Sequence, residues 1–188
     1  MKIVDANENI IQRLRSSNIS TEMKSLESCD WFVIDEKYDE ISGTAGLGGL
    51  FHVSGIQINE KFRGLGIGKK LQYELILESK KRGYSFITVF NDPRNRVSTK
   101  LHDSLGYQKL FRINYAKNIV NDVKGMAFNN RGKFVLNCLK LFNSKQGMLI
   151  LALSLKIFYK IFPNLIIYNE GGLPKPSIKW ITNNFEKI

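Results

Sequence analysis

The first 130 residues alternate between strand-like and helix-like hydrophobic patterns. Short runs rich in β-branched and aromatic residues predict strands, at residues 2–6, 31–35, 41–47, 52–58 and 84–90, and a closing hairpin at 107–117 and 123–129. Apolar residues at helical spacing predict helices, just after residue 5, at 21–28, at 67–82 and after residue 95. In the last of these helices, Val97, Leu101 and Leu105 form the face expected to be buried. Strands that alternate with helices predict an α/β fold.

From Arg131 onward the pattern changes to long apolar helical segments that carry single lysines. We therefore expect a boundary near residue 130, with an α/β domain at 1–130 and a helical extension at 131–188. The segment 147–162 is apolar, but 16 residues rise only about 24 Å as a helix, against a hydrocarbon core of ~30 Å. Lys156 and Lys160 also interrupt it, so a membrane span is not expected.

Charge separates the same two regions. Residues 117–188 hold 11 Lys/Arg against 3 Asp/Glu, a net +8, whereas residues 1–116 hold 17 against 14, a net +3. Because most of the positive charge lies in the tail, nucleic acid is an unlikely partner for the domain as a whole. Two interpretations of the tail stay open. In one, its helices pack on each other and on the sheet, and so close the acceptor side or form a homodimer contact. In the other, they dock peripherally at an anionic membrane surface.

The remaining composition is that of a globular protein, with 43% hydrophobic and 24% charged residues in 188. Cys29 and Cys138 are the only cysteines, and they stand in no metal-ligand spacing, so neither a disulfide framework nor a metal site is expected. A cytoplasmic location follows as the default. The first ten residues contain Asp5 and Glu8 and no long apolar core, which argues against a signal peptide.

The chemistry of the chain centres on a Gly-rich turn at residues 63–68, RGLGIG, between an alternating strand and a helix. Glycines let the backbone take positive φ and approach a ligand closely, and the first helical turn has N–H groups with no intrahelical partner. Arg63, Lys69 and Lys70 add positive charge. This turn is therefore expected to bind a phosphate or pyrophosphate.

Spacing separates three types of phosphate loop. A P-loop is excluded, because Arg63 stands where its first glycine belongs and Lys70 replaces the hydroxyl residue. A dinucleotide fingerprint fits weakly, because Lys69 takes the place of its third glycine and polar residues 59–61 separate strand from turn. The pattern Arg-x-x-Gly-x-Gly of residues 63–68 remains.

Other glycines crowd the strand expected at 41–47 and the residues after it, namely Gly43, Gly46, Gly48 and Gly49. They indicate either a bulged strand followed by a turn, or a place where a ligand approaches the backbone closely.

Two segments together resemble the GNAT superfamily of acyl-CoA-dependent N-acyltransferases. The first is the Arg-x-x-Gly-x-Gly turn, and the second is Asn95-x-x-Ser98-x-x-Leu101-His102-x-x-x-Gly106-Tyr107, at the spacing usual in that family. The resemblance covers roughly residues 32–109. It implies a mixed, centrally splayed β-sheet flanked by helices, with acetyl-CoA (coenzyme A) as the cofactor.

The resemblance also implies which residues contact that cofactor. Main-chain groups of Ile56, Gln57 and Ile58 are expected to bind the pantetheine arm, as an added strand would. The turn and the start of the helix are expected to bind the pyrophosphate, through Arg63, Gly64, Leu65, Gly66, Ile67, Gly68, Lys69 and Lys70. Asn95 and Ser98 are expected near the thiol end, and Asn91 is a further residue expected to bind the cofactor.

Acyl transfer to an amine requires removal of a proton from the amine, a hydrogen-bond donor for the oxyanion and departure of the thiolate. His102 stands at the motif position close to the leaving sulfur, where many GNAT enzymes have a tyrosine, and is the candidate acid. His52 begins the strand 52–58, on which the family often has an acidic base, and is the candidate base. Glu60 and Tyr107 are the alternatives.

These observations predict an N-acetyltransferase that acts on a primary amine by direct attack in a ternary complex. The alternative is a non-catalytic acyl-CoA sensor or interaction module, in which both histidines are incidental. A nucleic-acid-binding protein with a Gly-rich loop is a third interpretation, and steeply salt-dependent affinity for DNA or RNA would favour it. The acceptor amine is not specified by any motif.

Overall fold

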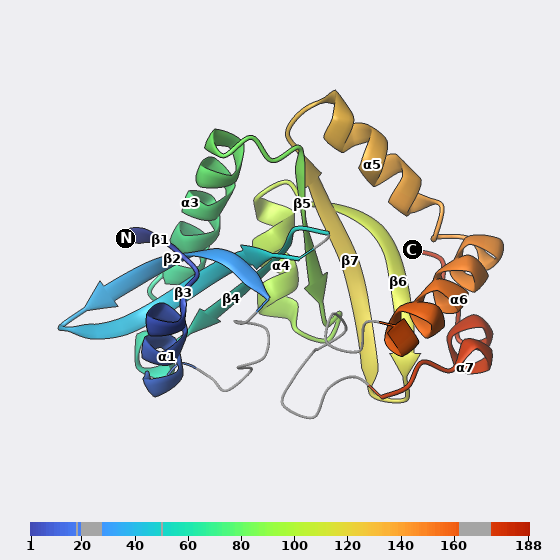
Figure 1. Cartoon of the computed structure of the whole chain (residues 1–188), viewed down its shortest axis with the longest axis horizontal. Coiled ribbons are helices and arrows are strands. Elements are labelled where there is room, and N and C mark those ends of the chain that lie inside the picture. The colour runs from blue at the N-terminus through green and yellow to red at the C-terminus, as the bar shows by residue number, and fades with distance from the viewer. Residues whose placement is uncertain (18, 20–27, 50, 162–173) are drawn as a thin grey trace. The chain divides into compact units, whose positions relative to one another are not determined.

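The computed structural model describes residues 1–17, 19, 28–49, 51–161 and 174–188. Within these residues the chain forms two compact units. The first is Met1–Tyr84, and the second consists of the described residues that follow Tyr84. Figure 1 shows the helices and strands of the chain. The boundary near residue 130 that the sequence suggests stays a prediction. By packing, the helices that follow residue 130 belong to the same compact unit as the strands that follow Tyr84.

The first unit is a four-stranded antiparallel sheet with helices on both faces. Its elements are β1 (Lys2–Asp5), α1 (Glu8–Ser16), β2 (Cys29–Lys37), β3 (Glu40–Gly48), β4 (Val53–Ile58), the 3-10 helix η1 (Glu60–Phe62) and α3 (Ile67–Lys81), with strand order β1-β2-β3-β4. Leu14 of α1 packs on Phe32 and Ile34, whereas α3 lies over the opposite side chains of β2, with Arg82 against Trp31. Alternation along β2 therefore gives each helix its own face of the sheet.

The glycines of β3 mostly make room for the protein itself. A Cβ added to Gly43 would lie 2.8 Å from Ile58 Cδ1 and 2.9 Å from Leu71 Cδ1, so glycine lets α3 approach the sheet closely. A Cβ on Gly48 would lie 2.0 Å from the carbonyl oxygen of Ser28. Gly49, with φ of 72°, forms the turn that the sequence predicts. Tight internal packing therefore explains Gly43 and Gly48 without a ligand.

In the part of the chain that the structure describes, the second unit combines an antiparallel sheet, in the order β5-β7-β6, with helices. Its elements are β5 (Phe86–Asn91), α4 (Arg96–Ser104), β6 (Gln108–Ala116), β7 (Ile119–Ala127), α5 (Asn130–Lys140), α6 (Lys145–Ile161) and α7 (Ile178–Asn183). Leu136 of α5, Met148 of α6 and Ile181 of α7 share one core with Phe111 and Val123 of the sheet. The expected packing of the tail helices on the sheet is thus confirmed.

Polar contacts hold the C-terminal residues against the same sheet and helices. The Asn143 side chain donates to the carbonyl oxygen of Ile188 (2.5 Å) and accepts from its N–H (3.0 Å). Arg112 pairs with the buried Asp122 and with Glu186, and the Asp122 carboxylate raises the pKa of Arg112. These contacts help to fix the position of α7 and, through Asn143, the approach to α6.

Several local predictions need correction. The strand expected at 52–58 begins at Val53, and His52 lies in the preceding turn with φ of 47°. Val97 is 81% exposed rather than buried, and α4 buries His102 instead. The second hairpin strand begins at Ile119, four residues earlier than expected. The helix expected at 21–28 falls, apart from its last residue, outside the described residues. In the described part of the chain, no helix has the length and hydropathy needed to cross a membrane.

Candidate functional site

The Gly-rich turn of the first unit has the geometry that an anion loop requires. Gly64 and Gly66 take φ of 82° and 73°, and Gly66 is the N-cap of α3 with no side-chain cap. The first bond of the helix that follows runs from Lys70 N–H to Gly66 O, at 3.3 Å. A Cβ on Gly64 or Gly66 would meet nothing in the protein within 4 Å. The protein therefore leaves open the space into which a Cβ of Gly64 or Gly66 would project, and a ligand can approach the backbone there.

Buried anchors hold the turn on both sides. Before it, Asn59 is buried, its N–H donates to Ser42 O (3.0 Å) and its side chain accepts from Lys61 N–H (3.1 Å). After it, Ile67 is buried at the start of α3. Gln72 of α3 also donates to Ser54 Oγ of β4 at 3.0 Å, which ties the helix to the strand. These contacts fix the turn to the sheet and to α3.

Positive charge surrounds this turn, as the sequence predicts. Arg63, Lys69 and Lys70 are all exposed, and Arg63 lies 3.2 Å from the Glu60 carboxylate. That exposed ion pair contributes little to stability. The open backbone of Gly64 and Gly66, the uncapped helix N-terminus and the cations together fit a pyrophosphate.

The strand that leads into the turn presents its main chain in extended form. In β4, Ile56, Gln57 and Ile58 pair with Ala45, Thr44 and Gly43 of β3. The side chains of these three residues are half-buried. An extended chain of this kind is the type of surface to which a further strand-like ligand hydrogen-bonds. Binding of the pantetheine arm here stays a prediction.

In the second unit, the two asparagines of the predicted site have structural contacts. Asn91, the last residue of β5, is buried and donates from Nδ2 to Thr99 Oγ1 at 2.7 Å. Asn95 is the N-cap of α4, and its Oδ1 accepts from Ser98 N–H at 3.0 Å. These bonds join β5 to α4 and start the helix, and they place Ser98 in its first turn. Cofactor contacts by all three residues stay predictions.

His102 is the most buried titratable group of the predicted site, with 6% of its surface exposed. Its Nδ1 lies 3.4 Å from Ser98 Oγ, and its ring meets Tyr107 edge-on at 5.3 Å between centroids. Burial, together with the positive charge of Lys124, lowers the pKa of His102 to about 4. The imidazole is therefore neutral at pH 7, and the acid role expected from the sequence stays a prediction.

Lys124 is a neighbour of His102 that the sequence analysis missed. It lies on β7 with 0% exposure, and its Nζ bonds to Asp103 Oδ1 (2.5 Å) and to Thr99 O (3.4 Å). Both acceptors belong to α4. A lone lysine between Val123 and Gly125 gives no local signal, because its partners lie more than twenty residues away in the chain.

His52 lies on the first unit, in the turn before β4. Its N–H donates to Gly49 O at 2.9 Å, and its ring meets Tyr84 edge-on at 4.7 Å between centroids. Tyr84 in turn accepts from Trp31 Nε1 at 3.3 Å. Burial lowers the pKa of His52, and the nearby Asp30 opposes this effect. A neutral imidazole at pH 7 can accept a proton, so the base role remains chemically sound although His52 is not part of the strand.

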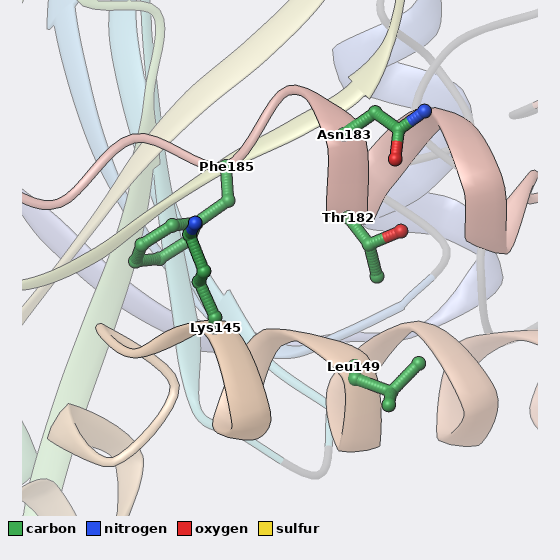
Figure 2. A pocket seen from close by; sticks show the side chains of 5 residues that line it. All are labelled: Lys145, Leu149, Thr182, Asn183 and Phe185. Carbon is green, nitrogen blue, oxygen red and sulfur yellow. The ribbon is translucent and has the colours of Figure 1, made fainter.

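A separate hollow of about 570 Å³ lies between α6 and α7 of the second unit (Figure 2). Its lining residues are Lys145, Leu149, Thr182, Asn183 and Phe185. None of the residues predicted for the cofactor site is among them. The described residues also contain no group of three or more His, Cys, Asp or Glu side chains that could hold a metal ion.

A comparison with models of known protein families identifies the family to which this chain belongs. The model of the Acetyltransferase (GNAT) family matches residues 7–107, more than half of the chain. The chain belongs to the GNAT family of acetyltransferases. This GNAT protein is accordingly an acyltransferase, and its acyl donor is acetyl-CoA. A comparison with curated proteins finds no match.

Solved structures agree with the fold of this GNAT acetyltransferase. A ribosomal-protein-alanine N-acetyltransferase from Brucella melitensis is 17% identical, with 68% of this chain and 100% of that chain covered and a TM-score of 0.54. An N-acetyltransferase from Staphylococcus aureus Mu50 is 16% identical, with 67% and 97% covered and a TM-score of 0.52. The GNAT-like α/β fold predicted from the sequence is thereby confirmed.

A third similar structure is yncA, a putative acetyltransferase from Salmonella typhimurium solved with its cofactor acetyl-CoA. It is 18% identical, with 53% of this chain and 65% of that chain covered and a TM-score of 0.48. The present chain thus spans slightly less than two thirds of the length of yncA.

The burial of His102 predicts a pH dependence of the stability of this GNAT acetyltransferase. Unfolded, the ring takes up a proton near pH 6.5, whereas in the folded protein it does so only near pH 4. The unfolded state therefore binds more protons in this window, and stability falls as the pH drops from about 6.5 to about 4. This residue contributes about 3 kcal/mol to that fall.

Urea unfolding at pH 7 and at pH 4.5 checks this prediction. We expect the loss of stability between the two pH values to be smaller in His102→Gln, which cannot titrate, than in the parent. Equal losses in both proteins would show that His102 titrates normally and is not shielded by burial and Lys124.

Proposed function

We propose that this GNAT acetyltransferase transfers the acetyl group of acetyl-CoA to a primary amine, by direct attack in a ternary complex. One observation supports the part of the proposal that concerns binding of acetyl-CoA. The turn of Gly64 and Gly66 is left-handed, open to a ligand and followed by an uncapped helix. Such a turn supplies several N–H donors to a pyrophosphate without a side chain in the way.

In this proposal, different residues of the chain bind different parts of the cofactor. Main-chain N–H groups from Leu65 to Lys69 bind the pyrophosphate, with charge from Arg63 and Lys70. The extended backbone of Ile56–Ile58 binds the pantetheine arm. Asn91, Asn95 and Ser98 stand with His102 at the thiol end. Acetyl-CoA itself, when bound, supplies a thioester that an amine can attack.

Proton transfer is assigned to the two histidines in different ways. A lysine-like amine has a pKa near 10.4 and is mostly protonated at pH 7, so it must lose a proton before it attacks. His52, whose pKa is lowered by burial, accepts that proton as a neutral base. His102 is neutral as well, and it hydrogen-bonds at the thiol end rather than donating a full proton there. A thiol with a pKa near 8.5 can leave as the thiolate with such help.

In this proposal the reaction takes place in the cytoplasm. The chain has two cysteines, Cys29 and Cys138, and neither forms a disulfide, which fits a reducing compartment. The family assignment favours a working enzyme over the acyl-CoA sensor that the sequence left open. Neither a homodimer nor the acceptor amine follows from the residues described.

A turnover screen with acetyl-CoA tests the proposal. Release of the free thiol is followed with peptide N-termini, polyamines, aminosugars and amino acids as acceptors. We expect release that depends on one class of amine, with intersecting initial-velocity lines, because both substrates must be bound before reaction. Parallel lines would indicate an acetyl-enzyme instead of a ternary complex. Stabilisation by acetyl-CoA without turnover on any amine would restore the sensor interpretation.

A further inference from the structure

Helix α6 exposes an apolar face that nothing in the described part of the chain covers. Its inner side contributes Gly147, Met148 and Ala152 to the second unit. The opposite side carries large apolar residues that are 44–60% exposed, namely Leu149, Ile150, Leu153, Ile157 and Ile161. Figure 1 shows α6 and α7 next to each other at the end of this unit.

The spacing of these residues makes a continuous strip along the helix. Ile150, Leu153, Ile157 and Ile161 follow one another at intervals of three and four residues, so they lie on one face. Scattered exposed apolar side chains are normal in proteins, but a contiguous strip of this kind marks a surface that meets an apolar partner.

Lysines flank the strip, and α6 contains no Asp or Glu. Lys156 and Lys160 lie one turn apart along one flank of it, and Lys145 lies at the start of the helix. All three are exposed, and no carboxylate of the described residues pairs with them. Neither α5 nor α6 contains Asp or Glu. The partner of this face is therefore expected to be both apolar and negatively charged.

The hollow between α6 and α7 belongs to the same surface. It shares Lys145 and Leu149 with the exposed side of α6, and Phe185 lines it as well. Figure 2 shows Lys145 and Leu149 extending from one helix and Thr182 and Asn183 from the other. A cation beside apolar groups suits the boundary between a phosphate headgroup and the start of an acyl chain.

We propose that the exposed face of α6 docks this enzyme on an anionic phospholipid surface, with the helix lying in the plane of the interface. Apolar residues enter the headgroup–acyl boundary, and Lys145, Lys156 and Lys160 contact lipid phosphates. The 17 residues of α6 rise about 26 Å, short of a hydrocarbon core of ~30 Å, which fits a helix that lies on the bilayer.

Other partners fit these observations less well. A second copy of the chain would bring two lysine-bearing faces together without a carboxylate between them, which costs free energy. Nucleic acid would meet the lysines but would leave Ile150, Leu153 and Ile157 without apolar contacts. An anionic bilayer satisfies both the charge and the apolar strip.

Co-sedimentation of the full-length protein with vesicles tests the proposal. We expect binding to vesicles of phosphatidylcholine with phosphatidylglycerol, and no binding to vesicles of phosphatidylcholine alone. Raising the salt concentration to 0.5 M, on the order of a 4 Å screening length, should weaken the binding. Protein that ignores the anionic vesicles would overturn the proposal.

Two pairs of variants separate the apolar from the ionic contribution. Leu153→Glu should weaken vesicle binding roughly 10- to 100-fold, because a leucine that would enter the bilayer is replaced by a charged carboxylate. Leu77→Glu is its matched control, since Leu77 is a helical leucine of α3 with similar exposure (42% against 45%), and it should bind as the parent does. Lys156→Glu with Lys160→Glu should weaken binding at least roughly 30-fold. The control with the same charge change is Lys80→Glu with Lys81→Glu on α3.

Each variant is first shown to be folded by its unfolding midpoint. Equal binding by Leu153→Glu and the parent would show that the apolar strip does not enter the bilayer, and would overturn the proposal. A dimeric parent that Leu153→Glu converts to a monomer, without any affinity for vesicles in either, would assign the face to a second copy instead. Neither result depends on which amine the enzyme acetylates.

Discussion

Gly66→Glu is expected to abolish the stabilisation of this protein by acetyl-CoA. At 100 times its dissociation constant, the cofactor adds about 2.7 kcal/mol to the parent, or roughly 5 to 10 °C in unfolding temperature. Gly66 is the N-cap of α3 with φ of 73°, and its missing Cβ faces open space. A glutamate there puts a carboxylate where the pyrophosphate should lie. A thermal shift assay with saturating acetyl-CoA measures the effect.

Gly83→Glu is the matched control for this variant. Gly83 follows the opposite end of α3, has φ of 81°, and also has no atom within 4 Å of an added Cβ. Both substitutions force a side chain into the left-handed region, at a cost of about 1–2 kcal/mol. Only Gly66→Glu should lose the response to acetyl-CoA. If Gly66→Glu keeps the full shift, the Gly-rich turn does not bind the pyrophosphate.

His102→Ala is expected to slow turnover by about 10²- to 10³-fold, with the affinity for acetyl-CoA changed only a few-fold. The reason is the loss of a hydrogen-bonding group at the thiol end, where charge develops as the thiolate leaves. The neutral state of His102, with a pKa of about 4, means that only about one ring in a thousand carries the extra proton at pH 7. Single-turnover rates and thermal shifts of parent and variant measure the two quantities.

His102→Gln distinguishes hydrogen bonding from proton transfer. Glutamine keeps an N–H donor and an acceptor but cannot act as an acid, so it should recover part of the rate lost in His102→Ala. Equal losses in both variants would favour a true proton transfer by His102.

His52→Ala should instead alter the low-pH limb of the rate profile, because His52 is the proposed acceptor of the amine proton. Near-normal turnover in every one of these variants would move the chemistry to water or to other residues.

Sequence alone determined the order of the elements and the nature of the Gly-rich turn. The signals involved are local. Alternation and helical spacing mark strands and helices, and glycines mark the positive φ of Gly64 and Gly66. Asn95 starts α4 by capping its own first turn, again within a few residues. Together with the GNAT motifs, these signals were sufficient to identify the cofactor.

Local signals were misleading where burial decides the outcome. The spacing of Val97, Leu101 and Leu105 suggested an apolar buried face, but Val97 is exposed and His102 takes the buried position. Helical periodicity defines a face, yet it does not define which neighbour that face meets. His52 likewise fitted a strand by alternation, whereas the turn from Gly49 places it at positive φ.

Only the tertiary structure decided the charge state of His102 and which side of α6 is exposed. The pKa of His102 is lowered first by burial and then by Lys124, which reaches α4 from β7 across more than twenty residues. The apolar residues of α6 divide into a core side and an exposed side according to what α7 and the sheet cover. Both properties arise from contacts between residues far apart in the chain, and such contacts leave no pattern in the sequence near the residues that they change.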